Sequence, residues 1–346
     1  SLKALKTDCM CKDRLFGGVW IMDEVQSHNF DKIIPFTLRK SKVRGRFVKL
    51  DKSLNGILAR HNYIRSISLC LSDALSASCC IGSFLKFNGL FTIQGSSKDS
   101  LKTILADYSS SGEIRGYANY DLKNIKLENE QVEIENYMSK GHLAFTAMES
   151  KSNKRYQGII PVQKGDFSNS IDYYFKNSEQ INSEIVCLSD CSKNSYISAA
   201  IIIQATPNEN EDNLDDASGV FEEAKLFLNS LKKSELLSKK VSMENILYKL
   251  FHSLDVRVLS EIKVIDKCRC SLDRVKNTLS NIPEKELKDI TFEDGSLEVT
   301  CEFCKKLTQF SKQDLSSMRK WIKFNTDFKL IVKIYMPKII TKELSR

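Results

Sequence analysis

The chain has 346 residues, of which 42% are apolar and 28% charged, so it is long enough for a sizeable hydrophobic core and about two domains. Its net charge is +8, but Lys305 to Arg346 hold eleven Lys or Arg against three Asp or Glu, which leaves the residues before them electrically balanced. A balanced body lacks the basic surface that dominates affinity for nucleic acid, so composition excludes a nucleic-acid function outside this tail.

The eleven cysteines indicate the cellular compartment. They are too sparse and too irregular for the disulfide framework of a small secreted protein, and a chain of this length does not need one. No stretch reaches the roughly 18 uncharged apolar residues of a membrane helix. The apolar run from Leu15 to Met22 is too short for a secretory signal. We therefore expect a soluble protein in the reducing cytoplasm, with no membrane partner.

The first part of the chain changes from an irregular segment to regular structure. Residues 1–31 show no clear hydrophobic period and are predicted to be an N-terminal extension. From Ile33 the pattern is strand-like, and Gly45 inside it marks a bulge or a close backbone approach. Apolar residues then recur every three or four residues, which predicts a largely helical region over 55–87 with a break near Asn62.

Several chemically reactive side chains in this half of the chain are predicted to be inert. Cys9 and Cys11 could bind a metal ion, but no second pair lies nearby, which favours an incidental pair of thiols. Cys79 and Cys80 would face a helical core, where a thiol behaves as a small hydrophobe. His61 is predicted to be a packing residue, because no cysteine, serine or carboxylate is placed by sequence to partner it.

Residues 32–207 are predicted to form an α+β core domain. Its expected elements after the first helical region are a three-strand meander (91–94, 102–107, 113–120), a hairpin (131–138 with 141–148), a strand over 156–161, a helix through 173–175 and a strand pair (184–188 with 196–204). No glycine-rich phosphate loop or nucleophile elbow occurs in this domain, so we do not expect an enzyme.

Residues 208–266 are predicted to form a helical linker. The composition shifts at residues 208–224, which hold seven acids and no base. Two short helices follow, with apolar faces too small to stand alone. An ordinary connector and a segment poised between docked and undocked states both stay open. The residues that mark the two faces are Phe227, Leu228, Leu250 and Phe251.

Two close pairs of cysteines dominate residues 267–318: Cys268-Arg-Cys270 and, after thirty intervening residues, Cys301-Glu-Phe-Cys304. Four thiolates are a ligand set that suits tetrahedral Zn²⁺, so the pattern predicts a small zinc-binding domain. The first pair is Cys-x-Cys rather than the usual Cys-x₂₋₄-Cys, and the gap exceeds the common finger spacing. Other close cysteine pairs occur in the chain, so chance pairing stays open.

The order of short motifs from about Phe36 to Met318 resembles the heat shock protein 33 family, the redox-regulated chaperonin. No single string decides the resemblance, which rests on their order along most of the chain. The strings are Val43-Arg44-Gly45-Arg46, His61-Asn62-Tyr63, Leu85-Lys86-Phe87-Asn88-Gly89, Gln94, Ala106-Asp107-Tyr108, Arg115-Gly116-Tyr117-Ala118, Tyr156-Gln157-Gly158, Ser178-Glu179-Gln180, Gln204 with Pro207, Cys268-Arg269-Cys270-Ser271 and Val299-Thr300-Cys301-Glu302-Phe303-Cys304.

The resemblance implies a cytoplasmic, ATP-independent holdase with an α+β core domain, a helical linker and a Cys₄ zinc-binding domain. It implies that Cys268, Cys270, Cys301 and Cys304 bind one zinc ion in the reduced, inactive state. Oxidation would form the disulfides Cys268–Cys270 and Cys301–Cys304, release zinc and unfold the zinc-binding domain with the linker.

The expected partners are unfolding client proteins. A homodimer is expected when the chain is oxidised, and no nucleic-acid partner is expected. If the zinc-binding domain covers the linker, the apolar faces would lose their cover when this domain unfolds. The faces marked by Phe227, Leu228, Leu250 and Phe251 are therefore the candidate client-binding residues.

Two other functions stay open. A zinc ribbon could bind nucleic acid through the basic extension over 319–346, which lies outside the resemblance. A thiol enzyme could use Cys301 and Cys304 as a redox couple, but it needs a low-pKa cysteine at a helix start, whereas 296–300 is strand-like. The chain departs from the family at Ile64, where proline is usual, and at 305–308, but no departure affects a ligand.

Overall fold

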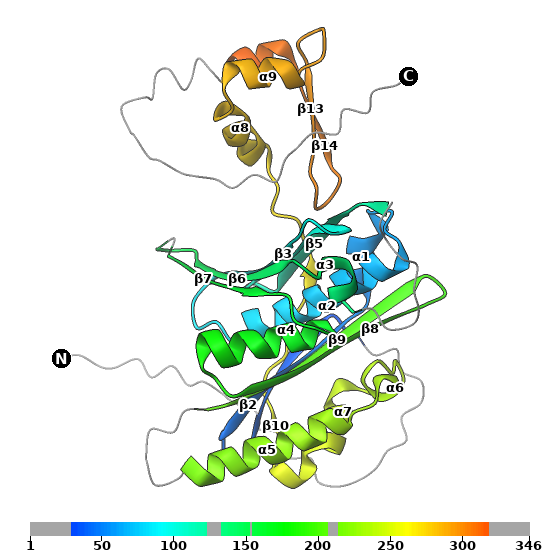
Figure 1. Ribbon diagram of the computed structural model, residues 1–346, viewed down its shortest axis with the longest axis vertical. Helices are drawn as coiled ribbons and strands as arrows, with labels where there is room; N and C mark the ends of the chain where they lie inside the picture. The colour runs from blue at the N-terminus through cyan, green and yellow to red at the C-terminus, as the bar shows by residue number, and fades with distance from the viewer. Residues whose placement is uncertain (1–28, 123–132, 153, 207–213, 318–346) are drawn as a thin grey trace, which may run out of the picture.

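The computed structural model describes residues 29–122, 133–152, 154–206 and 214–317. Cys9, Cys11 and the basic extension over 319–346 lie outside these residues, so the predictions made for them stay predictions. In the part that the structure describes, two sheets enclose a layer of helices, and further elements lie beyond the outer side of each sheet (Figure 1). The α+β fold class predicted from the sequence is confirmed.

The first sheet has the strand order β10-β1-β2-β9-β8, and β11 also pairs with β1. The run Ile197–Ile203 of β9 is buried on both faces, because helices lie on both sides of this sheet. The predicted pairing of 184–188 with 196–204 is confirmed. The bounds are β1 Lys32–Leu38, β2 Val43–Leu50, β8 Ser183–Ser192, β9 Ser195–Ala205, β10 Arg257–Val258 and β11 Ile262–Lys263.

Helix α2 (Arg65–Gly82) forms the centre of the body, as we call residues 32–206, and is buried along almost all of its length between the two sheets. Its Ser, Ala and Cys side chains are small enough for both sheets to approach. The serine hydroxyls bond back to the helix, as Ser72 Oγ donates to Ser68 O at 2.6 Å. The other helices of this layer are α1 Lys52–Ala59, α4 Phe167–Tyr174 and the π-helical turn η2 Phe175–Glu179.

The predicted helical region over 55–87 is confirmed with its break, since α1 ends at Ala59 and α2 begins at Arg65. It ends at Gly82 rather than near Phe87. Gly82, the last residue of α2, lies so close to Tyr108 and Phe91 of the second sheet that a Cβ at this position would collide with them.

The second sheet has the order β12-β5-β4-β3-β6-β7 and contains the predicted meander. The predicted hairpin of 131–138 with 141–148 is wrong. Residues Glu135–Met138 form the short helix α3, closed by Gly141 N donating to Met138 O, and β6 pairs with β3 and β7 instead. The strands are β3 Gly89–Ser96, β4 Leu101–Ser109, β5 Glu113–Tyr120, β6 His142–Glu149, β7 Arg155–Pro161 and β12 Ile265–Asp266.

The linker helices, α5 (Leu214–Ser230), α6 (Lys233–Leu236) and α7 (Met243–Phe251), cover the outer face of the first sheet (Figure 1). Together with that face they form a second hydrophobic core, separate from the core around α2. The 3₁₀ turn η4 (His252–Leu254) ends this region. Among the described helices, none is long and apolar enough to span a membrane.

Residues Arg257–Asp266, which we call the strap, connect the linker helices to the C-terminal part. The strap contains β10 and β11 on the first sheet and β12 on the second, so it crosses from one sheet to the other.

The cysteine module, residues 267–317, lies beyond the second sheet, at the far side of the body from the linker helices (Figure 1). It contains α8 (Leu272–Ser280), α9 (Glu284–Ile290) and the hairpin of β13 (Leu297–Thr300) with β14 (Leu307–Phe310). Its own core is small. The buried apolar residues are Leu279, Leu287, Leu297, Phe310 and Leu315.

Candidate functional site

The four cysteines of the module come from two short loops. Cys268 and Cys270 follow β12 and precede α8, whose N-cap Ser271 accepts a hydrogen bond from Arg274 N. Cys301 and Cys304 lie in the turn of the β13–β14 hairpin. In this turn Lys305 N donates to Cys301 O at 2.8 Å, and Cys301 N donates to Lys306 O at 3.0 Å. The hairpin thus fixes the second pair, and the helix cap fixes the chain just after the first pair.

The four Sγ atoms all lie within 4.8 Å of one another. The Cys268–Cys301 separation is 3.8 Å and the Cys270–Cys304 separation is 3.4 Å, and all four thiols are free. A tetrahedral site with Zn–S bonds of about 2.3 Å has S···S edges of about 3.8 Å. The geometry and the all-sulfur donor set therefore fit a zinc ion held by these four residues.

Burial and neighbouring thiols shift the pKa of Cys268, Cys270 and Cys301. Burial, followed by the neighbouring thiols, raises the pKa of Cys270, and burial raises the pKa of Cys301. Burial also acts to raise the pKa of Cys268, but hydrogen bonds from Cys270 and the other thiols outweigh it and lower the pKa. Four thiols at this spacing cannot all ionise without a compensating cation. The cluster is thus suited to a metal ion rather than to four separate thiolates.

Arg269, between the first two cysteines, ties the module to the body. Its Nη2 donates to Asp107 Oδ2 at 2.5 Å, and Asp107 on β4 is only 2% exposed. The same carboxylate accepts from Arg115 Nε at 2.8 Å and from the Thr92 hydroxyl. Charge-assisted bonds to a buried carboxylate are among the stronger polar contacts in proteins.

Phe303, between the second two cysteines, makes the matching contact. Its ring lies 3.8 Å below the guanidinium of Arg115 and meets Tyr117 edge to face with centroids 5.0 Å apart. Its carbonyl oxygen lies 3.1 Å from His61 Nε2. His61 is therefore a packing residue, as predicted, but it packs at the contact between module and body. Arg269 and Phe303, which both contact the body, thus each lie inside a cysteine pair.

The remaining described cysteines differ from these four. Cys70, Cys79, Cys80 and Cys187 are buried in the core around α2, and burial raises the pKa of each. The inert character predicted for Cys79 and Cys80 agrees with this environment. Cys191 is partly exposed and lies outside the cluster.

The apolar faces of the linker helices are docked on the first sheet. Leu228 and Phe251 are fully buried in the second core, and Phe227 and Leu250 pack against it from partly exposed positions. The prediction that the module covers these faces is wrong, because the first sheet covers them and the module lies at the other end of the body (Figure 1).

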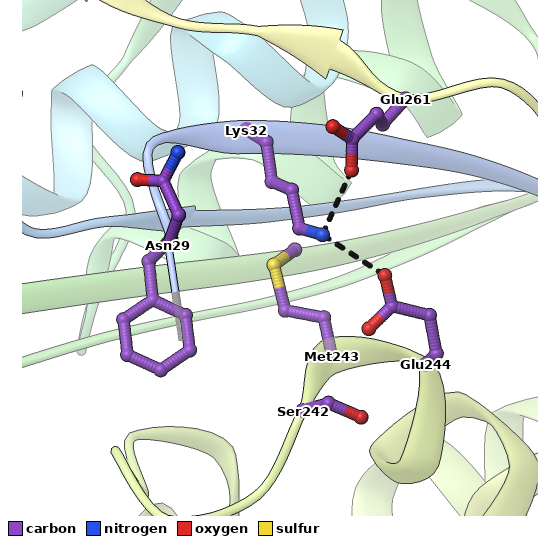
Figure 2. A pocket seen from close by; sticks show the side chains of 7 residues that line it. Asn29, Lys32, Ser242, Met243, Glu244 and Glu261 are labelled. Carbon is purple, nitrogen blue, oxygen red and sulfur yellow. Dashed lines mark hydrogen bonds and ion pairs between the residues drawn. The ribbon is translucent and has the colours of Figure 1, made fainter. Parts of the chain in front are cut away.

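Polar contacts add to this docking. Figure 2 shows Lys32 of β1 between Glu244 of α7 and Glu261 of the strap, with Nζ 2.9 and 2.8 Å from their carboxylates. Lys49 of β2 donates to Ser238 O, between α6 and α7, at 2.5 Å. Sequence periodicity does not predict these hydrogen bonds and ion pairs, because each joins residues about 190 or more positions apart.

The comparisons with known proteins identify the family. The family model described as Hsp33 protein matches residues 31–311. The chain belongs to the Hsp33 family. It is 28% identical to the 33 kDa chaperonin of Pseudomonas syringae over 291 residues, which cover 84% of this chain and 94% of that protein. It is 27% identical to the 33 kDa chaperonin of Shewanella loihica over 278 residues, covering 80% and 92%.

Among solved structures, the Hsp33 homologue of Thermotoga maritima matches with a TM-score of 0.73 at 20% identity, covering 85% of this chain and 99% of that one. This likeness supports the fold. The membership of the Hsp33 family, whose curated relatives are named chaperonins rather than enzymes, supports a chaperone role for the chain.

Proposed function

We propose that the chain is a redox-regulated, ATP-independent holdase. Cys268, Cys270, Cys301 and Cys304 bind one zinc ion in the reduced, inactive state. The proposal divides the chain into a core domain (32–207), a redox-sensitive linker (208–266) and a switch domain (267–318). The observation that carries it is the convergence of four free thiols within 4.8 Å in a module with only five buried apolar residues.

Such a module depends on its metal. Structural zinc contributes about 10 to 16 kcal/mol in small modules. This matches or exceeds the net stability of about 5 to 15 kcal/mol of a whole domain. The bound metal keeps the sulfurs as thiolates, the form that oxidants attack. Losing the ligands therefore unfolds the module.

Oxidation supplies the switch. With hydrogen peroxide as oxidant, the thiolates of Cys301 and Cys304 form one S–S bond, and the two electrons they give up reduce peroxide, with two protons, to two water molecules. Cys268 and Cys270 react in the same way. Each disulfide removes two of the four ligands, and the remaining pair cannot hold the ion. The module and the linker then unfold and expose surface that binds unfolding proteins.

Zinc content before and after peroxide, measured with client binding on the full chain, tests the proposal. Reduced protein should hold one zinc and should not suppress aggregation of citrate synthase diluted from guanidinium, whereas oxidised protein should hold none and should suppress it. Cys304→Ser should lose metal affinity sharply, and Cys191→Ser should behave as the parent. Full metal affinity in Cys304→Ser, or an oxidised protein that protects no client, would remove the proposal.

A further inference from the structure

The strap occupies an outer edge of both sheets. On the first sheet it runs antiparallel to β1, with Val258 opposite Phe36 and Ile262 opposite Ile33. On the second sheet it runs parallel to β5, with Ile265 opposite Glu113. Without it, the main-chain groups along these edges of β1 and β5 have no strand beside them.

Main-chain hydrogen bonds hold the strap. Leu259 N donates to Pro35 O at 2.8 Å, Val264 N donates to Asp31 O at 2.8 Å, and Ile265 N donates to Gly112 O at 2.9 Å. Most strap side chains point outward, and Val264 is its one buried apolar side chain, at 3% exposed. Two side-chain ion pairs, Lys32 with Glu261 and Arg60 with Asp266, add to these bonds. Because the pairing along the sheet edges is itself main-chain, other sequences can replace the strap there.

The edge of β1 pairs with the strap in two short, separate stretches, β10 and β11. Along an antiparallel strand, the main-chain N–H and C=O groups of successive residues point to opposite neighbours. Those of Ile33, Pro35 and Thr37 point toward the strap, and those of the residues between them point toward β2. Pro35 has no N–H to donate, and the strap breaks between β10 and β11 at this point. Proline in a sheet belongs to an edge strand.

We propose that these edges of β1 and β5, once the strap has left, bind client proteins by strand addition. The ligand class is an extended polypeptide segment with unpaired main-chain groups, of any sequence that can adopt the β conformation. Strand addition takes its affinity from main-chain bonds, and folded proteins rarely offer a free extended backbone. The strap is the internal occupant of the same edges. This inference rests on the proposed function, in which oxidation unfolds the linker.

Two synthetic peptides test the inference on the full chain. The first has the strap sequence over 257–266, and the second is the same peptide N-methylated at the residues equivalent to Leu259, Val264 and Ile265. Their side chains are identical, but the second lacks the three N–H groups that donate to Pro35 O, Asp31 O and Gly112 O. The oxidised protein should bind the first peptide and the reduced protein should not, as measured by fluorescence anisotropy. The second should bind at least about tenfold more weakly, the effect of about 1.4 kcal/mol.

Hydrogen exchange locates the binding site. Amides of Ile33 and Thr37 should exchange faster after oxidation and slow again when the first peptide binds. Amides of Ile34 and Phe36, which face β2, serve as the internal control. A saturating amount of the first peptide should also weaken the suppression of citrate synthase aggregation.

The outcomes separate this inference from the proposed function. Equal affinity for both peptides, no binding of either, or undiminished suppression at saturating peptide would overturn strand addition while leaving a working holdase. An oxidised protein that suppresses no aggregation, with or without peptide, would remove both.

Discussion

Lys49 is a charged side chain in a largely apolar environment. It is fully buried between β2 and the linker helices, where Nζ bonds Ser238 O and lies 4.3 Å from the ring centroid of Phe30. Burial lowers the pKa of Lys49 from 10.5 to about 8, with the positive charge of Lys239 lowering it further and Asp51 opposing. At neutral pH the buried charge on Lys49 therefore lowers the free energy of unfolding.

This cost predicts a pH dependence of stability. Between the folded pKa of about 8 and the unfolded pKa of 10.5, the unfolded state binds more protons, so stability rises with pH. The expected gain in unfolding free energy from Lys49 is about 2 kcal/mol between about pH 7 and about pH 9.5. Urea unfolding of the reduced, metal-loaded protein measures it. Lys49→Met should lose this gain, and an identical pH profile in the variant would contradict the assignment.

At the scale of single elements, Leu228 decides whether α5 is docked. Its side chain is fully buried against the first sheet, whereas Leu226 on the same helix is 71% exposed. Leu228→Asp should undock the helix, because it removes about 1.5 to 3 kcal/mol of apolar burial and places a carboxylate in the core. The reduced variant should suppress client aggregation without oxidant.

Leu226→Asp is the matched control, since the same charge on the exposed face should leave the reduced protein inactive. A Leu228→Asp variant that undocks α5, as judged by hydrogen exchange, yet protects no client would show that linker release is not the switch.

Gly112 controls the strap. Its φ is +83°, and a Cβ at this position would collide with the carbonyl oxygen of Lys263. Gly112→Ala should therefore lift the strap from β5 in the reduced protein and speed exchange of the Lys267 amide, which donates to Ile114 O. Gly165→Ala, at φ +97° beside the Asn169 side chain, tests for general strain. Equal exchange at Lys267 in both variants would contradict the role of Gly112.

The sequence predicted the elements whose side chains carry a strong pattern. The helical periodicity of α2 and the alternation of β3 to β5 are visible because burial selects their residues. Helix α3 was missed because four residues contain little more than one turn. The two-residue strands of the strap were missed because their pairing is mainly main-chain and leaves no hydrophobic period.

The candidate site was predictable only in part, for a similar reason. Close cysteine pairs are a local pattern, so their spacing pointed to these four thiols, although other close pairs left chance pairing open until the family resemblance was considered. The contact of Arg269 with Asp107 joins residues 162 positions apart. An arginine at 269 does not by itself predict that its partner is the aspartate at 107. The placement of the module away from the linker likewise follows from tertiary packing.

For the whole molecule, the positions of module, strap and linker predict an order of events. Chelation of the metal from reduced protein should unfold residues 267–317 first, then free the strap, and only then loosen the linker helices. The reason is that the strap is the covalent connection between the module and the linker helices, which lie at opposite ends of the body. Pulsed hydrogen exchange after adding a chelator measures this order. Loss of protection in α5 while the strap stays protected would contradict it.

The anchors inside the cysteine pairs also constrain how this chain can evolve. Arg269 and Phe303 must reach Asp107 and Arg115 from positions fixed by the sulfur atoms on either side. An insertion in either pair could leave four sulfurs able to hold a metal ion and still move an anchor away from the body. The spacing of each pair therefore has to meet two requirements at once, metal binding by the sulfurs and contact of the residue between them with the body.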